Sequence, residues 1–198
     1  MKLLNTILLT TLSATLLLAA APKAKLSKQE QNLNYTIKMG DKSSKILLKT
    51  LNSKMKKKMV NKGVLKTFDF CSDEAYKLTQ KVNKQIPKGV TVKRISSKYR
   101  SPANRPKDNE GAVLDSFEAM LKANIILPKY LIQKVDSQTD KYYKPIIIND
   151  QVCLECHGEI SKNIDLRRKS AELYPLDNAV NYKKHELRGA IVVTVKHQ

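Results

Sequence analysis

The sequence of 198 residues has no tryptophan, only three histidines and only three cysteines. So few cysteines, and an odd number of them, argue against a framework of disulfide bonds and leave one thiol unmatched. The three histidines give a short inventory of imidazole ligands for a metal. Acidic residues are also scarce, with 18 Asp and Glu against 37 Lys and Arg, so the formal net charge is +19.

The first 24 residues have the layout of a secretory signal peptide. Lys2 precedes an uncharged, leucine-rich stretch that ends in Ala19-Ala20-Ala21, an A-x-A cleavage pattern. The alternative is an uncleaved membrane anchor, but an anchor needs about 20 strongly apolar residues, and Thr, Ser and Asn dilute this stretch. We therefore expect export to the periplasm and a single domain over residues 25–198. No later stretch is apolar and long enough to span a membrane.

Export makes nucleic acid an unexpected partner despite the strong positive charge. The charge is suited to an acidic protein partner or to peripheral contact with anionic lipid head groups. A lysine-rich surface that is simply well solvated is a third interpretation. The six arginines are placed less evenly than the lysines and lie between Arg94 and Arg188. Because the planar guanidinium suits carboxylates, they favour a carboxylate-bearing ligand.

The apolar periodicity predicts an α+β domain with helices packed on one side of an antiparallel sheet. Gly63 is expected to stop a long first helix, and Cys71 falls on the apolar face of the second. The expected helices cover residues 27–62, 64–84 and 108–123; the expected strands cover 90–96, 129–135, 141–148 and 189–195, and residues 159–187 are expected to be irregular.

The main motif is Cys153-Leu154-Glu155-Cys156-His157. C-x-x-C-H is the attachment signal for a c-type haem, in which the two thiols add to the vinyl groups and the histidine binds the iron. The two-residue gap places both sulfurs on one side of a helical turn. Haem attachment takes place outside the cytoplasm, in agreement with the signal peptide. The motif thus predicts one covalently bound haem c.

Three other interpretations of the motif are weaker. A dithiol oxidoreductase of the thioredoxin type places its cysteine pair early in the fold, whereas only 42 residues follow Cys156. A structural zinc ion needs four ligands, which Cys71, His185 or His197 would have to complete. The third interpretation is a small loop disulfide between the two cysteines of the motif.

The second axial ligand of the iron must come from elsewhere in the chain. His197 is penultimate, His185 lies in a polar segment, and Met55, Met59 and Met120 are typical of core positions. Cys71 is the unmatched thiol, on an apolar helix face, in a compartment where free thiols are hazardous. We therefore favour Cys71.

Several blocks of the sequence resemble the PAS-like c-type monohaem domain family, over about residues 40–195. These blocks are FDFCSDEA (68–75), VKRISSKYRSPANRPKDNE (92–110), CLECHG (153–158), YPLDNAVNY (174–182) and LRGAIVV (187–193). The resemblance implies a PAS-like sheet with a long N-terminal helical pair and one haem. It also implies that Cys71 is the distal thiolate opposite His157. Arg105, Lys107, Asn181 and His185-Glu186 depart from the usual family pattern.

Together these observations predict an exported monohaem cytochrome c that transfers electrons to an acidic redox protein. The alternative is a haem-based redox or gas sensor subunit that acts through a partner. No general acid–base pair is evident, so we do not expect an enzyme. Candidate contacts of the haem propionates are Arg94, Arg100 and Arg188, and Tyr174 and Tyr182 are expected to wall the pocket.

Overall fold

The computed structural model describes residues 26–197, so the expected signal peptide lies outside the described residues. The fold is built on one antiparallel sheet of four strands in the order β1-β4-β3-β2. The expected α+β class, with an antiparallel sheet and N-terminal helices, is confirmed. Within residues 26–197, no helix is both long enough and apolar enough to cross a bilayer. The strands are β1 (Val90–Ile95), β2 (Leu131–Lys134), β3 (Thr139–Ile147) and β4 (Leu187–Lys196).

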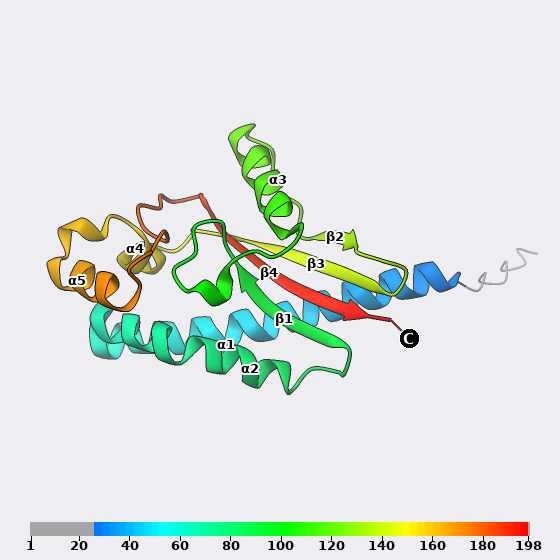
Figure 1. Cartoon of the computed structure of the whole chain (residues 1–198), viewed down its shortest axis with the longest axis horizontal. Helices are drawn as coiled ribbons and strands as arrows, with labels where there is room; N and C mark the ends of the chain where they lie inside the picture. Colours follow the sequence, from blue (N-terminus) through cyan, green and yellow to red (C-terminus); the bar gives the residue numbers. More distant parts are fainter. Residues whose placement is uncertain (1–25, 198) are drawn as a thin grey trace, which may run out of the picture.

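The last strand of the chain, β4, occupies the centre of the sheet between β1 and β3 (Figure 1). Val193 is paired with Val92 of β1 and with Tyr142 of β3. The run Ala190–Val193 is completely buried because both faces of β4 are covered. A strand buried on both sides is continuously apolar rather than alternating, which explains why residues 189–195 could be identified from sequence.

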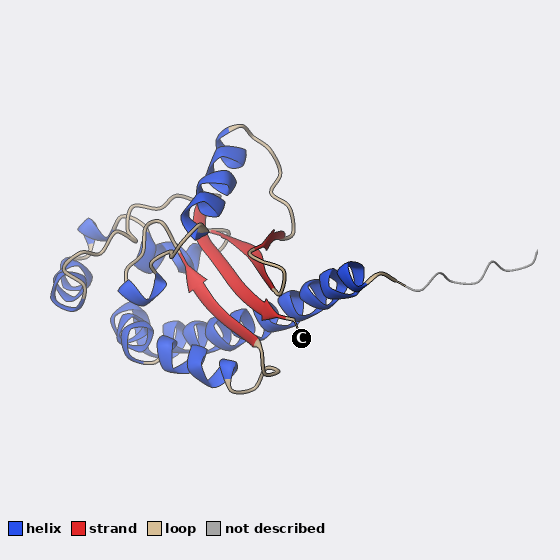
Figure 2. Cartoon of the chain, turned by 45° about the vertical axis from the view of Figure 1, so that its right-hand side comes forward, coloured by secondary structure: helices blue, strands red, loops and turns tan. Residues whose placement is uncertain are grey.

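Helices cover both faces of the sheet (Figure 2). On one face lie α1 (Lys28–Asp73) and α2 (Ala75–Asn83), and α3 (Glu110–Lys122) packs on the other and projects away from it. The expectation that the helices pack on one side only was therefore wrong for α3. Its apolar side chains contact the second face of β4 instead.

Gly63 divides α1 into two arms, as the sequence predicted. Its backbone angles, φ 74° and ψ −177°, are not helical and belong to a region that is essentially restricted to glycine. We call residues 28–62 the first arm and residues 64–73 the second arm. The second arm and α2 run back along the first arm, so that the three segments form a helical hairpin (Figure 1).

The first arm lies directly on the sheet at Gly40. A Cβ atom at this position would lie 2.2 Å from the ring of Tyr142, far inside any allowed contact. The small buried side chains of Thr36, Ser43 and Ser44 line the same side of the helix. This close contact fixes the height of α1 above the sheet, and with it the position of the helix segment that follows.

Residues 159–187 are more ordered than the sequence suggested. They contain a 3-10 turn at Ile160–Lys162 and the helix α5 (Ile164–Leu173). The side chain of Asn163 caps α5 by accepting a hydrogen bond from the amide of Leu166. The sequence did not predict this helix because its composition is polar. Leu166 is its one buried apolar side chain, so no apolar periodicity is present.

Candidate functional site

A cavity of about 160 Å³ lies between the hairpin, the sheet and the short helix α4 (Gln151–His157). A second cavity of about 120 Å³ shares seven lining residues with the first, so the two adjoin. Apolar side chains from both arms and from β3 form much of the wall of the first cavity. They include Leu48, Leu51, Met55, Phe68, Ile146 and Ile148, and the same cavity contains Cys71, Cys153, Cys156 and His157.

The helix α4 carries the whole C-x-x-C-H motif. Asp150 caps its N-terminus, because the carboxylate accepts a hydrogen bond from the amide of Val152. The same carboxylate forms an ion pair of 2.5 Å with Lys56 of the first arm, which ties α4 to the hairpin. Cys153 is half-buried and Cys156 is buried. Burial raises the pKa of the Cys156 thiol to about 12, with a further contribution from Cys71, so in this cavity the thiol form is favoured.

The imidazole of His157 is held in one tautomer. Its Nδ1 lies 2.8 Å from the carbonyl oxygen of Ala179, and since a carbonyl only accepts hydrogen bonds, Nδ1 carries the proton. Burial lowers the pKa of His157 well below its usual value, and the nearby Arg188 and Arg100 lower it further. The ring is therefore neutral and Nε2 keeps its lone pair, which is the form that binds a metal.

Cys71 is brought to both cavities by the second arm. The side chain is exposed, yet the surrounding protein is dense enough to raise the pKa of its thiol. Both observations hold because Cys71 lines both cavities, where its side chain borders open space inside the protein. Three cations, Arg94, Arg100 and Arg188, oppose the rise in pKa and would favour the thiolate.

The three arginines have different surroundings. Arg100 is engaged within the chain, since its Nε donates to Asp177 at 2.7 Å and its Nη2 donates to the carbonyl oxygen of Cys156 at 2.7 Å. Arg188 donates through Nη1 to Ser96 at 2.8 Å. The buried Nε of Arg94 has no hydrogen-bond partner among residues 26–197, and desolvation lowers the pKa of this guanidinium. Arg94 is thus the side chain best placed to receive a carboxylate.

The two tyrosines also differ. Tyr174 lines the second cavity, and its ring meets that of Phe68 edge-on at 6.2 Å. We expected Tyr182 to form part of the pocket wall, but it is not on the lining of either cavity. Its ring packs against the imidazole of His157 instead, with the ring centres 6.2 Å apart.

Most of the rival ligands are not on the lining of the cavity. Neither His185 nor His197 is on its lining, and His197 is paired with Asp140 at 2.8 Å. Among the methionines weighed as ligands, Met55 does line the cavity. No group of three or more His, Cys, Asp or Glu side chains that could hold a metal ion gathers within residues 26–197.

Sequence reasoning missed the residues that position the site. Asp177 accepts hydrogen bonds from Arg100 at 2.7 Å and from Ser170 at 2.6 Å, and the carbonyl of Ala179 orients His157. Both residues lie in the YPLDNAVNY block that the sequence had singled out. A hydrogen bond to a backbone carbonyl cannot be predicted from residue type. Asp177, however, is the one charged residue of this block, and that was a usable signal.

The donor set fits a haem. Two neighbouring thiols, a neutral imidazole, a further thiol and a guanidinium meet between apolar walls. The buried Nε of this guanidinium has no hydrogen-bond partner in the described part of the chain. Each cavity is smaller than a typical cofactor pocket of about 300–1,000 Å³. Cys153, Cys156, His157 and Cys71 would hold the haem, and Arg94 would receive one of its carboxylates.

Comparisons with known proteins agree with this fold. The model of the Tll0287-like family matches residues 19–196. Among solved structures, the chain is similar to the cyanobacterial heme-protein Tll0287, with a TM-score of 0.58 and 19% identity over 87% of this chain and 98% of the other. No curated protein matches. Because the family model covers nearly the whole length, this chain belongs to the Tll0287-like family.

Proposed function

We propose that the chain binds one haem c covalently through Cys153 and Cys156, with His157 and Cys71 as axial ligands, and transfers electrons outside the cytoplasm. The observation that carries the proposal is the cavity that contains all three cysteines and an imidazole with a free Nε2. The solved structure with the same fold is described as a heme-protein, which supports the same cofactor here.

Each side chain has a defined task in this proposal. The Ala179 carbonyl and the Tyr182 ring hold the imidazole of His157 in place. Cys71 must lose its proton to act as a ligand, and the three nearby arginines lower the cost of that loss. The haem supplies a one-electron couple, and a thiolate donates electron density that favours the ferric state. The protein is therefore expected to have a low reduction potential.

The surroundings of the site suggest how the protein works. The N-terminal 24 residues would direct export to the periplasm and be removed there. The net charge of the full chain is +19, and loss of Lys2 and Lys23 with the N-terminal 24 residues would leave +17. This charge would accelerate encounter with an acidic redox protein. Six-coordinate iron has no open position, so oxygen carriage and peroxidase chemistry are not part of the proposal.

A sensor function is the second candidate, and one observation favours it. Cys71 lies on the second arm, which is joined to the rest of α1 only through the non-helical Gly63. Release of Cys71 would remove one of the contacts that hold this arm at the cavity, and a partner bound to the hairpin could detect the change.

The test is to produce the chain in a bacterial host that attaches haem outside the cytoplasm. Mass spectrometry should show the mass of one haem on the wild type and none on a Cys153→Ser/Cys156→Ser variant. In Cys71→Ala the thiolate-type low-spin ferric bands should disappear, and the reduction potential should rise by on the order of 100 mV. Met55→Leu, in the same cavity, is the matched control and should keep both properties.

Each outcome has a clear consequence. A colourless wild-type protein would refute haem binding. An unchanged spectrum in Cys71→Ala would refute the distal ligand alone. Rapid binding of carbon monoxide by the reduced wild type would show that Cys71 leaves the iron, and would favour the sensor function over electron transfer.

A further inference from the structure

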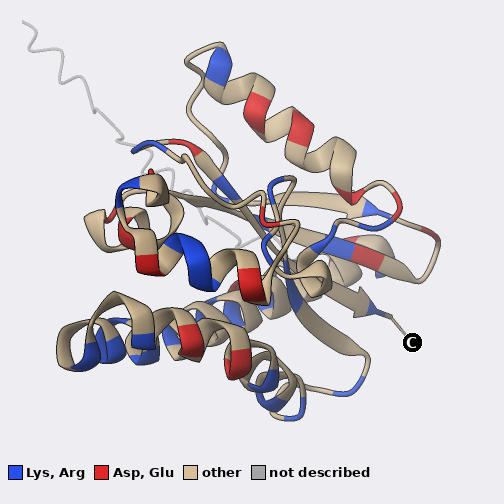
Figure 3. Cartoon of the chain, turned by 60° about the vertical axis from the view of Figure 1, so that its left-hand side comes forward, with Lys and Arg blue, Asp and Glu red and all other residues tan. Residues whose placement is uncertain are grey.

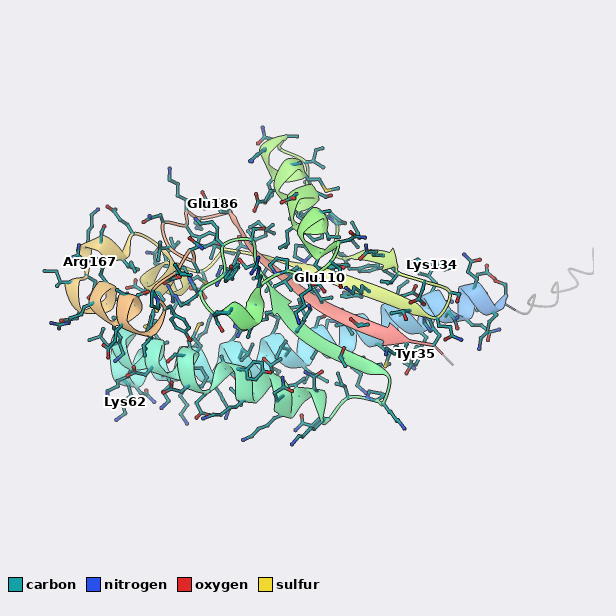
Figure 4. All side chains as sticks on the ribbon, in the orientation of Figure 1. Tyr35, Lys62, Glu110, Lys134, Arg167 and Glu186 are labelled. Atoms are coloured by element: carbon teal, nitrogen blue, oxygen red, sulfur yellow. The ribbon has the colours of Figure 1, made fainter. Side chains whose placement is uncertain are left out.

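The tip of the helical hairpin projects beyond the core and is strongly basic. No residue from Asn52 to Lys66 is buried. Residues 42–68 contain nine lysines and no aspartate or glutamate. In Figure 3 the basic segments gather at the tip of the hairpin and the acidic segments follow on the second arm. Lys62, at the end of the first arm, is labelled at the lower left of Figure 4.

Three of these lysines form a ladder of like charges. Lys54, Lys58 and Lys62 follow one another at a spacing of four residues, which places them on one face of the first arm. Like charges at this spacing destabilise a helix. Neither these three lysines nor Lys57 forms an ion pair with any residue in the range 26–197. The repulsion between these lysines thus destabilises the first arm, and no contact within residues 26–197 compensates for it.

The ladder faces a groove of about 1,000 Å³ between the two arms. The opposite wall contains Asp69, Asp73 and Glu74, and Phe70 also lines it. Asp69 is already neutralised by Lys169 at 2.6 Å and by Lys66 at 3.8 Å, and Glu74 lies 3.6 Å from Lys77. Two of the three carboxylates are therefore compensated within residues 26–197, whereas Lys54, Lys57, Lys58 and Lys62 are not, so lysines are in excess in the groove.

From this arrangement we infer that the groove between the two arms binds an acidic polypeptide segment of a partner protein. Unpaired lysines that weaken their own helix are expected at a functional site, and charge complementarity specifies an anionic occupant. The lysines line a groove between two helices, which a polypeptide segment can enter but a planar bilayer cannot follow. This shape favours a protein over a membrane surface.

The groove adjoins the arm that also lines the haem cavity, so a segment bound in the groove would affect that cavity. The second wall of the groove, residues 66–74, is the arm that carries Cys71, and Phe70 is the neighbour of Cys71 in the chain. A partner in the groove would therefore contact the arm that brings the proposed distal ligand to the iron. This link to the iron rests on the proposed function, whereas the binding of an acidic segment does not.

The experiment uses the haem-loaded full chain and a fluorescently labelled peptide of twelve glutamates, with fluorescence anisotropy at low ionic strength. Lys54→Gln/Lys58→Gln/Lys62→Gln should weaken peptide binding at least tenfold. The matched control is Lys84→Gln/Lys88→Gln/Lys122→Gln, which removes the same charge from exposed lysines elsewhere and should weaken binding less than threefold. The groove variant should melt at the same temperature as the wild type or higher, because like-charge repulsion is relieved.

Three results would overturn the inference. Equal weakening by the two triple variants would show that net charge alone attracts the peptide. A lower melting temperature in the groove variant would show that the ladder serves the fold. Stronger binding to phosphatidylglycerol vesicles, lost in the groove variant, would identify a membrane instead. The absorption spectrum of each sample reports the haem separately, so failure of the proposed function would be distinguished from failure of this inference.

Discussion

At the scale of single residues, the site combines features that sequence reveals and features that it does not. The C-x-x-C-H spacing identified His157, but the tautomer of its ring depends on the carbonyl of Ala179, 22 positions away. Likewise, the sequence predicted the same role for Arg94 and Arg100, as contacts of the haem propionates. The structure separates them, because Arg100 is paired with Asp177 and Arg94 has no partner for its buried Nε within residues 26–197.

Replacement of Arg94 by methionine should have opposite effects with and without haem. In a haem-free Cys153→Ser/Cys156→Ser background, Arg94→Met removes a desolvated cation whose buried Nε has no partner within residues 26–197. The substitution should stabilise the fold by about 1–3 kcal/mol. In the haem-loaded protein, loss of a cation near the iron stabilises the ferric state, so the reduction potential should fall. A unit charge at roughly 9 Å with an effective dielectric constant of about 20 contributes about 2 kcal/mol, or about 80 mV for one electron.

Denaturant unfolding and a redox titration measure the two effects of Arg94→Met. Arg105→Met is the control, because Arg105 is exposed and should change neither quantity appreciably. If Arg94→Met left the potential of the haem-loaded protein unchanged, the proposed pairing of Arg94 with a propionate would be refuted.

At the scale of secondary structure, prediction succeeded where apolar periodicity was strong. The break at Gly63, the hairpin of β2 and β3, and β4 were all expected near their observed positions. The helix α5 was missed because its packing uses Leu166 as the one buried apolar side chain, too weak a signal for a periodicity argument. Its cap, Asn163, three residues before the bonded amide of Leu166, was the available clue.

Gly63 and Gly111 provide a matched pair of substitutions. A Cβ at either position meets no atom within 4 Å, but Gly63 has a positive φ of 74° and Gly111 does not. Gly63→Ala should therefore destabilise the fold by about 1–3 kcal/mol through backbone strain alone. Gly111→Ala, within α3, should stabilise it by roughly 0.5–1 kcal/mol. Urea unfolding monitored by circular dichroism would measure both, and similar values for the two variants would contradict the strained turn.

At the scale of the whole molecule, the scarcity of acidic residues makes each buried carboxylate important. Glu110, labelled at the centre of Figure 4, is 1% exposed and joins three parts of the fold. It begins α3 and accepts hydrogen bonds from Lys93 of β1 at 2.7 Å and from Lys141 of β3 at 3.1 Å, as well as from the amide of Lys107. No sequence pattern indicated this contact, because its partners are 17 and 31 positions away.

Acid should therefore unfold this protein partly through Glu110. Desolvation raises the pKa of Glu110, but the hydrogen bonds from Lys93, Lys107 and Lys141 outweigh it and hold the pKa below the usual 4.5. A carboxyl with a depressed folded-state pKa contributes its full stability above the unfolded-state pKa, and loses it as the pH falls through the folded-state pKa. Glu110→Gln should thus cost about 3 kcal/mol at pH 7, since it leaves two lysines facing a neutral group.

The difference in unfolding free energy between wild type and Glu110→Gln should shrink as the pH falls below about 4.5, because protonation then neutralises Glu110 in the wild type as well. Asp115→Asn, on the exposed side of the same helix, should show almost no difference at any pH. Added salt should stabilise all three proteins in acid, since protonation of the 18 acidic side chains leaves 37 Lys and Arg without counter-charge. A difference that stayed constant from pH 7 to pH 3 would show that the Glu110 side chain stabilises the fold by packing and not by its charge.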